Sequence, residues 1–260
     1  MKLMKICTTA LLLVPAAAFA ASAFDGTWKF SLDHIQLSKK PLVFLLQNGE
    51  FICKSCRAPT LIKADGTDQK IKGNPNIDTA AITIVDANTI TAIYKLGGKT
   101  VVSRKTVVAA DGKTAVDEET SLYGSEPSVF KERWTRIAEG PAGSHVLSGS
   151  WREAKQLSAT GPSTLVTYGM TEDGFTMSSN GQSYNAKFGD KSFLTAGDLT
   201  NTMVNLRKVS DTEVIETDSQ QGKPVETFDM TVSPDGKTLH VVDTMLFNKG
   251  VQHYDLTKSP

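Results

Sequence analysis

The sequence predicts an all-β fold of two tandem antiparallel up-and-down β-barrels that arose by internal duplication. Three observations carry this prediction: short alternating runs rich in Val, Ile, Thr, Phe and Tyr, turn formers between these runs, and landmarks that repeat after 123 or 124 residues. No stretch shows the sustained apolar spacing of an amphipathic helix. Neighbouring runs are also too closely joined for crossover helices, so we expect the sheets to be antiparallel.

The duplication is visible as landmarks that keep nearly one offset across most of each half. They are Gly26-Thr27-Trp28 with Gly149-Ser150-Trp151, Phe51 with Phe175, Gly73 with Gly197, Gly98-Lys99 with Gly222-Lys223, and Asp111–Thr114 with Asp235–Thr238. Such regularity is hard to obtain by chance. It predicts one repeat over 24–137 and a second over 149–260, joined by a linker over 138–148 that is made of turn formers.

Each repeat is expected to hold roughly eight or nine strands at ordinary strand and loop lengths. The clearest runs are 80–85, 89–94 and 100–108 in the first repeat, and 203–209, 213–217 and 239–244 in the second. Asn, Asp and Gly between these runs tolerate positive φ and favour hairpins. Antiparallel strands in this number close into a barrel, which removes exposed edges and leaves room for packed side chains or one small ligand.

The first 23 residues are predicted to be a secretory signal peptide. Lys2 and Lys5 form a charged start, Ile6–Val14 form the apolar stretch, and small residues predict cleavage after Ala20 or Ala23. The apolar stretch is too short to span a bilayer, which takes about 20 residues. No second long apolar segment follows, so we expect no integral membrane segment after cleavage. The Lys-containing start and Ala-rich end are typical of bacteria, which predicts a periplasmic or secreted protein.

Charge and composition exclude several classes of protein. Lys and Arg number 28 and Asp and Glu number 28, so the chain lacks the basic balance that nucleic acid binding requires. No Walker loop, dinucleotide fingerprint or EF-hand loop is present, and no cofactor is expected. The histidines at 34, 145, 240 and 253 have no paired ligand spacing, so no metal site is expected either. The acidic run Asp117-Glu118-Glu119 is interpreted as a solvated loop or edge. Nothing in the sequence indicates the oligomeric state.

Cys53 and Cys56 are the two cysteines that remain once signal cleavage removes Cys7. In an oxidising compartment we expect them to form a structural disulfide. A redox-active pair is the alternative, because disulfides that close short loops are often reactive. A thioredoxin-type motif would need a helix after the first cysteine, and none is predicted. The second repeat has Met177 and Asn180 at these positions, so the fold does not require the pair.

The start of the first repeat, Phe24-Asp25-Gly26-Thr27-Trp28-Lys29, resembles the opening of calycin chains, the lipocalins and fatty-acid-binding proteins. The resemblance implies a barrel whose Trp closes one end and packs beneath an Arg of the last strand, for which Arg133 and Arg136 are the candidates. Thr135-Arg136-Ile137 is also similar to the closing strand of fatty-acid-binding proteins, in which an Arg holds the ligand carboxylate. The second repeat ends His253–Lys258 with no Arg.

The whole chain more closely resembles a family of uncharacterised exported bacterial proteins. The shared motifs are G-T-W-K, C-x-S-C, A-D-G-x-D, G-x-P before D-T, and a late D-G-K-T. They correspond to Gly26–Lys29, Cys53–Cys56, Ala64–Asp68, Gly73–Pro75 with Asp78-Thr79, and Asp111–Thr114. These motifs are mostly turn chemistry, so the resemblance implies a fold rather than an activity.

The function that we expect is a periplasmic small-molecule-binding protein, with an apolar or amphipathic ligand in one or both barrels. Trp28 and Trp151 are candidates for the ligand-stacking wall, or else plugs of the core, and Arg133 or Arg136 would be the polar handle. An isomerase, lyase or hydrolase of a small aromatic or lipid-like compound is the second hypothesis. Its residues to test are Arg136 and His34, the latter as a general base or else an ordinary loop histidine. A structural or envelope-stress protein with filled barrels is the third.

Overall fold

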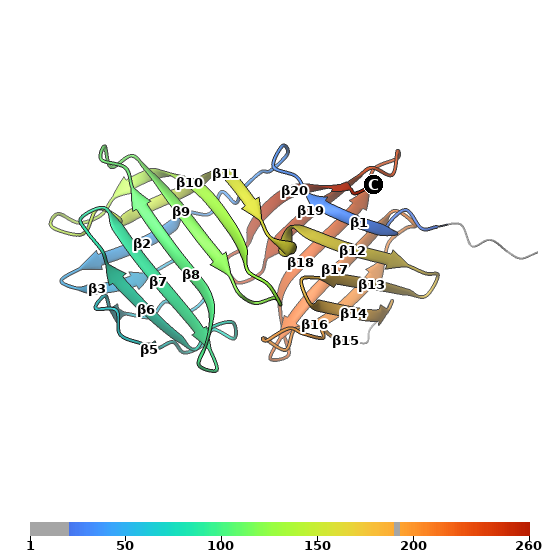
Figure 1. The fold of residues 1–260 in the computed structure, drawn as a ribbon, viewed down its shortest axis with the longest axis horizontal. Helices are drawn as coiled ribbons and strands as arrows, with labels where there is room; N and C mark the ends of the chain where they lie inside the picture. Colours follow the sequence, from blue (N-terminus) through green and yellow to red (C-terminus); the bar gives the residue numbers. More distant parts are fainter. Residues whose placement is uncertain (1–20, 190–192) are drawn as a thin grey trace, which may run out of the picture.

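The computed structural model describes residues 21–189 and 193–260, so nearly all of the predicted signal peptide lies outside the described residues. The described chain forms two ten-stranded antiparallel sheets, and each curls into a nearly closed barrel. Figure 1 shows the barrels side by side. The predicted fold class is therefore confirmed. No helix in the described ranges is both long and apolar enough to cross a membrane.

Each repeat contributes ten strands, because very short strands join the eight or nine expected. In the first repeat they are β1 (Gly26–Phe30), β2 (Leu42–Gln47), β3 (Glu50–Cys53), β4 (Ile62–Lys63), β5 (Gln69–Lys70), β6 (Thr79–Ile84), β7 (Thr89–Leu96), β8 (Lys99–Val108), β9 (Thr114–Ser121) and β10 (Ser128–Glu139). In the second they are β11 (Gly149–Thr160), β12 (Leu165–Met170), β13 (Gly174–Ser179), β14 (Gln182–Lys187), β15 (Phe193–Leu194), β16 (Met203–Lys208), β17 (Glu213–Gln220), β18 (Lys223–Val232), β19 (Thr238–Met245) and β20 (Gly250–Lys258). A single turn of 3-10 helix, η1 (Pro162–Thr164), precedes β12.

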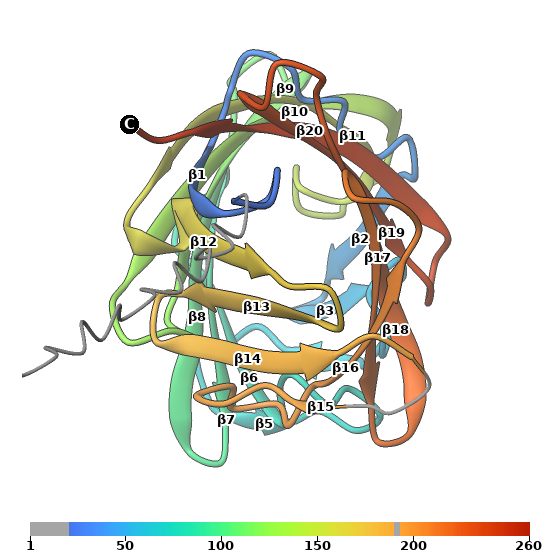
Figure 2. The same ribbon diagram turned by 90° about the vertical axis from the view of Figure 1, so that its right-hand side faces the viewer.

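The two barrels exchange their first strands, which the sequence did not predict. One sheet has the order β4-β3-β2-β11-β10-β9-β8-β7-β6-β5, and the other β14-β13-β12-β1-β20-β19-β18-β17-β16-β15. The first strand of each repeat therefore completes the barrel of the other repeat. We call the sheet that contains β11 the first barrel and the sheet that contains β1 the second barrel. Figure 2 views the molecule from the side of the second barrel, where β1 lies near β12 and β20.

The exchange is possible because β1 and β11 present equivalent side chains to their neighbours. Trp151 lies opposite Leu42 and Arg136 in the first barrel, and Trp28 lies opposite Val166 and Lys258 in the second. The first strand of either repeat can therefore occupy the same position in a sheet. As a consequence, neither barrel is complete without chain from both repeats.

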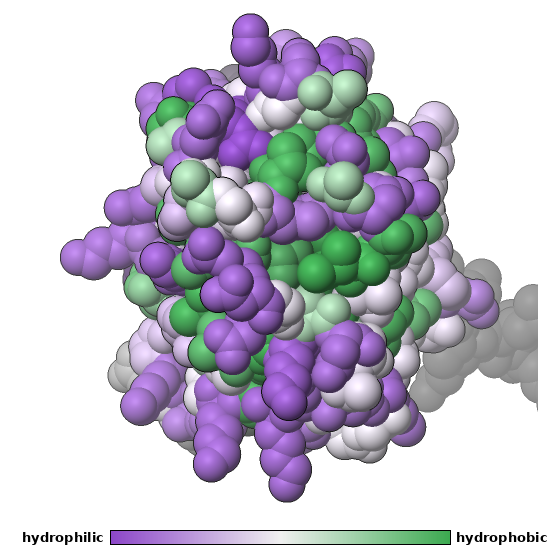
Figure 3. Space-filling model, turned by 90° about the vertical axis from the view of Figure 1, so that its left-hand side faces the viewer, coloured by the Kyte–Doolittle hydropathy of each residue, from purple (hydrophilic) through white to green (hydrophobic). Residues whose placement is uncertain are grey.

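Each barrel has its own hydrophobic core, closed at one end by a tryptophan. Trp28 and Trp151 are both fully buried. Each indole Nε1–H donates to a backbone carbonyl four residues earlier, on Phe24 and on Leu147, at 2.8 Å in both cases. Burial together with a satisfied indole N–H is typical of a core residue. Figure 3 shows that the outer end of the first barrel also carries apolar side chains among polar ones.

Candidate functional site

Each barrel holds a cavity whose wall is completed by residues of the other barrel. The cavity of the first barrel has a volume of about 470 Å³, and that of the second about 460 Å³. Both volumes are in the range of small-molecule sites. We call them the first cavity and the second cavity. Asp218 of β17 lines both, so the two cavities adjoin where the barrels meet.

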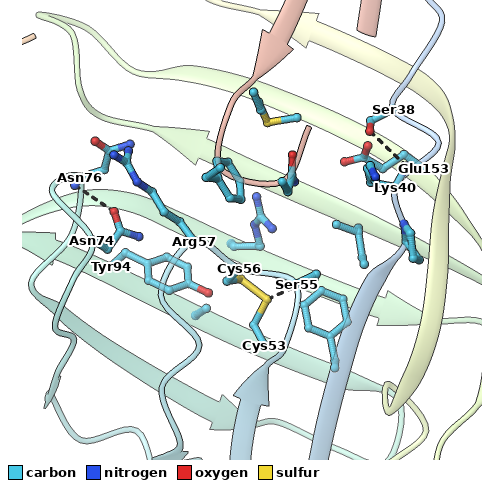
Figure 4. Close-up of a pocket in the computed structure, with 18 of the residues that line it drawn as sticks. Ser38, Lys40, Cys53, Ser55, Cys56, Arg57, Asn74, Asn76, Tyr94 and Glu153 are labelled. Atoms are coloured by element: carbon cyan, nitrogen blue, oxygen red, sulfur yellow. Dashed lines mark hydrogen bonds between the residues drawn. A yellow bond between two sulfur atoms is a disulfide. The ribbon is translucent and has the colours of Figure 1, made fainter. Parts of the chain in front are cut away.

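The first cavity is lined by aromatic residues of the first barrel together with polar residues from both barrels. Figure 4 labels polar residues of this lining, among them Ser38, Asn74 and Glu153. Phe44 lies between Phe51 and Trp134, with ring centroids 6.0 and 5.8 Å away and nearly parallel planes. Arg57 reaches across the junction and donates from Nη1 to Oε1 of Gln220 at 2.9 Å. An apolar wall with a few fixed polar groups suits an amphipathic molecule.

The predicted disulfide between Cys53 and Cys56 is confirmed, and it forms part of the wall of the first cavity. The S–S distance is 2.01 Å and the two Cα atoms are 5.4 Å apart. Figure 4 shows the bridge beside Ser55 and near the Tyr94 hydroxyl. The Ser55 hydroxyl also accepts a hydrogen bond from the Val43 backbone N–H at 2.9 Å, which ties the loop after β3 to β2.

A cluster of ionisable groups lies inside the first barrel, and it corrects the interpretation of the acidic run 117–119. Asp117 is buried on the central strand β9, and its Oδ1 accepts a hydrogen bond from the Thr106 hydroxyl at 2.6 Å. Arg104 of β8 pairs with Asp117 at 3.4 Å and makes a short contact with Glu119. The run is therefore not a solvated loop: alternation along the strand turns Asp117 and Glu119 inward, while Glu118 pairs with Lys131 on the outer face.

Two further carboxyls complete this cluster. Glu153 of β11 lines the first cavity, and burial together with the neighbouring Glu132 raises the pKa of Glu153 to about 7. Burial also raises the pKa of Glu132 on β10. Arg104 is the cation that opposes both shifts, so one guanidinium serves several inward carboxyls.

The second cavity combines aromatic residues with carboxyls. Glu216 of β17 accepts a hydrogen bond from the Tyr184 hydroxyl at 2.5 Å, and Asp243 of β19 accepts one from Gln252 Nε2 at 2.6 Å. Burial, and then the nearby Glu216, raise the pKa of Asp218 to about 9. Burial and the nearby Asp243 likewise raise the pKa of Glu226, at the junction, to about 9. Desolvation therefore favours the protonated form of these acids.

Neither tryptophan and neither arginine predicted as a ligand contact lines these two cavities. Instead, the closing strand of each barrel lays a cation over the tryptophan. The Arg136 guanidinium carbon is 4.0 Å from the ring centroid of Trp151, and Lys258 Nζ is 5.0 Å from that of Trp28. The arrangement that the calycin resemblance implied is thus present, but between strands of different repeats.

Arg136 donates its hydrogen bonds to backbone carbonyls at the closed end of the first barrel. Its guanidinium donates to the carbonyls of Gly112, Val146 and Ser148, the last at 2.8 Å. Arg133 is exposed on the outer face of β10, and His34 is exposed in the segment after β1. The structure does not bring His34 and Arg136 together with the cavities. Ligand contact and catalysis by these residues stay predictions.

The comparisons with known proteins add no assignment. No protein-family model, no curated protein and no solved structure matches this chain. The two nearly closed barrels are compatible with a lipocalin-like double barrel, and membership of the exported bacterial family stays a prediction.

The inward polar residues are what sequence reasoning missed, and a signal for them exists. On β19, Asp243 follows the buried Val241 at a spacing of two residues, and on β17, Glu216 follows the buried Val214 in the same way. Period-2 alternation places such neighbours on one face. Extending the apolar parity of each strand to its charged residues would have placed both carboxyls inside the barrel.

Proposed function

We propose that this protein binds a small amphipathic molecule in its barrel cavities, in the periplasm or outside the cell. The observation that carries the proposal is the pair of cavities of about 470 and 460 Å³, each lined by aromatic and aliphatic side chains together with polar and charged ones. Burying apolar ligand surface contributes roughly 25 cal/mol per Å², and the polar groups orient the ligand. The cavities also speak against barrels filled by side chains.

Native mass spectrometry of the protein purified from the periplasm, compared with its denatured mass, tests the proposal. We expect a native excess mass of one or two small molecules that denaturation removes. Alternatively, a native mass equal to that of the chain with its disulfide, even after incubation with amphipathic compounds, would contradict the proposal.

Variants that fill one cavity at a time locate the ligand. Ala92 is buried on β7 and lines the first cavity, and Val241 is buried on β19 and lines the second. Ala92→Phe and Val241→Phe should each remove the mass bound in that barrel. Thr91→Phe adds the same ring one residue away, at a position that alternation turns outward, and should leave the bound mass unchanged.

A further inference from the structure

We propose that the second cavity takes an organic cation, an ammonium group on an apolar or aromatic body, with Asp243 as its counter-ion. This inference rests on the proposed function and names the class of ligand for one of the two cavities. It follows from a comparison of equivalent positions in the two barrels.

Both barrels have an inward acid at the same position, but the second barrel lacks the cation that pairs with this acid in the first barrel. In the first barrel, Arg104 lies directly opposite Glu119 on the neighbouring strand. In the second, the same cross-strand position pairs Phe228 with Asp243. Glu119 and Asp243 lie 124 residues apart in the sequence, as do Arg104 and Phe228. The carboxyl is therefore retained while its guanidinium partner is replaced by a phenyl ring.

Asp243 is the group that this replacement leaves unpaired. It is 4% exposed, lines the second cavity, and accepts one hydrogen bond at Oδ2 from Gln252. Its Oδ1 is buried and receives no hydrogen bond from any amide, hydroxyl or cationic group of the described chain. The neighbour of Asp243 on the adjacent strand β18 is another carboxyl, that of Glu226. A buried acid beside a second acid requires either a shared proton or an added cation.

The surrounding charges and rings favour the cation. Four carboxyls line the second cavity, and no Lys, Arg or His is among the described residues that line it. The acids are Glu132, Glu216, Asp218 and Asp243. The cations that act on acids around this cavity line the first cavity instead: Arg57 acts on Glu226, and Arg104 acts on Glu132.

Aromatic side chains supply the second half of the site. Phe228 lies opposite Asp243, and Tyr168 and Tyr254 line the same cavity. Phe30 packs on Tyr254 with ring centroids 5.5 Å apart. Ring faces attract ammonium groups, and the attraction is stronger where water is excluded. Two residues further along the same strands, the cavity is lined by Met230 and Val241, which suits the apolar body of the ligand.

Isothermal titration calorimetry with three probes of equal chain length tests the inference: octyltrimethylammonium, octan-1-ol and octanoate. We expect the cation to bind at least about tenfold more tightly than the alcohol, and octanoate to bind more weakly than both. Equal affinity for the alcohol and the cation would overturn the cation inference while leaving the proposed function standing. Binding of none of the probes would also overturn it, and the native mass would then decide the proposed function separately.

Two variants assign the preference to Asp243. Asp243→Asn keeps the shape and the contact with Gln252 but removes the charge, so the preference for the cation should fall to within about threefold of the alcohol. Phe228→Arg restores the pairing of the first barrel and should exclude the cation. Asp229→Asn removes the same charge from the outward position next to Phe228 and should leave all three affinities unchanged. A cation preference that persists in Asp243→Asn would show that the proposal is wrong.

Discussion

The two barrels share one strand plan but carry different chemistry at the same inward positions. In the first barrel an inward arginine, Arg104, lies opposite a glutamate, Glu119, and a second acid, Asp117, lies two residues away on the same strand. In the second barrel the equivalent pair is a phenylalanine, Phe228, opposite an aspartate, Asp243, and the next inward pair along these strands is apolar. The first interior places an arginine among its acids, whereas no Lys, Arg or His is among the described residues that line the second cavity.

The difference shows that the residues that build the barrel and those that line its cavity are separate sets. Both repeats keep the glycine before the tryptophan, the Asp-Gly turns and a cation over the indole ring. These features lie at strand ends and at the closed ends of the barrels. The cavity positions lie in mid-strand, where a side chain can change without altering the backbone.

Cutting the linker gives the largest expected effect, and it tests whether each barrel contains strands of both repeats. A protease site inserted between Ala142 and Gly143, which are both exposed, would separate the repeats covalently. Because β1 and β11 each complete the other barrel, the two fragments should stay together in size-exclusion chromatography and separate only in denaturant. Fragments that part as two folded barrels under native conditions would contradict the strand exchange. Uncut protein with the same insertion is the control.

Removing either tryptophan should be about equally damaging. Trp28→Ala and Trp151→Ala should each lower the free energy of unfolding by about 3–5 kcal/mol, because each leaves a large cavity in a closed barrel end. Urea unfolding measures both. A loss below about 1 kcal/mol in one of them would break the equivalence of the two barrels, and the Phe variants at the same sites should retain most of the stability.

Neutralising the arginine of the first barrel should cost more than the matched change in the second. Arg104→Met leaves Asp117 buried without its cation and should lower the free energy of unfolding by about 2 kcal/mol. This value lies below that of a fully buried pair, because 33% of the Arg104 side chain is exposed. Phe228→Met should cost about 1 kcal/mol. Equal losses in urea titrations would mean that the buried ion pair adds nothing.

The buried acids Asp218 and Glu226 should make the protein less stable at alkaline pH. The pKa values of Asp218 and Glu226 are raised to about 9, against about 4 in an unfolded chain. Their contribution is therefore fully present below pH of about 4 and is lost as the pH rises through about 9, since the folded state must then give up protons that it holds more tightly. We expect the free energy of unfolding to fall by about 1–2 kcal/mol between neutral pH and pH of about 9, allowing for cavity water.

Thermal or urea unfolding across this pH range measures the slope, and Asp218→Asn should flatten it. Asp229→Asn, on the outer face, should leave the slope as it is. A wild-type slope that is flat above neutral pH would show that these carboxyls are already ionised in the folded protein.

Much of the fold followed from local patterns, whereas little of the site did. Alternation and turn residues predicted the antiparallel strands, and the Cys53–Cys56 spacing predicted the disulfide. The residues predicted to contact a ligand, Trp28, Trp151, Arg133 and Arg136, lie outside the two cavities, and their contact with a ligand stays a prediction. Asp243 and Glu216 carried a readable signal in their spacing from buried valines.

By itself the sequence determined the β class, the turns and the disulfide, since each depends on residues close together along the chain. Only the tertiary structure decided which first strand completes which barrel and which acids face a cavity without a cation. β1 and β11 begin with the same glycine and tryptophan and satisfy the same neighbours, so local pattern cannot distinguish the exchanged arrangement from the unexchanged one. The pairing of charges inside a barrel likewise joins different strands, and it exists only once the sheet has closed.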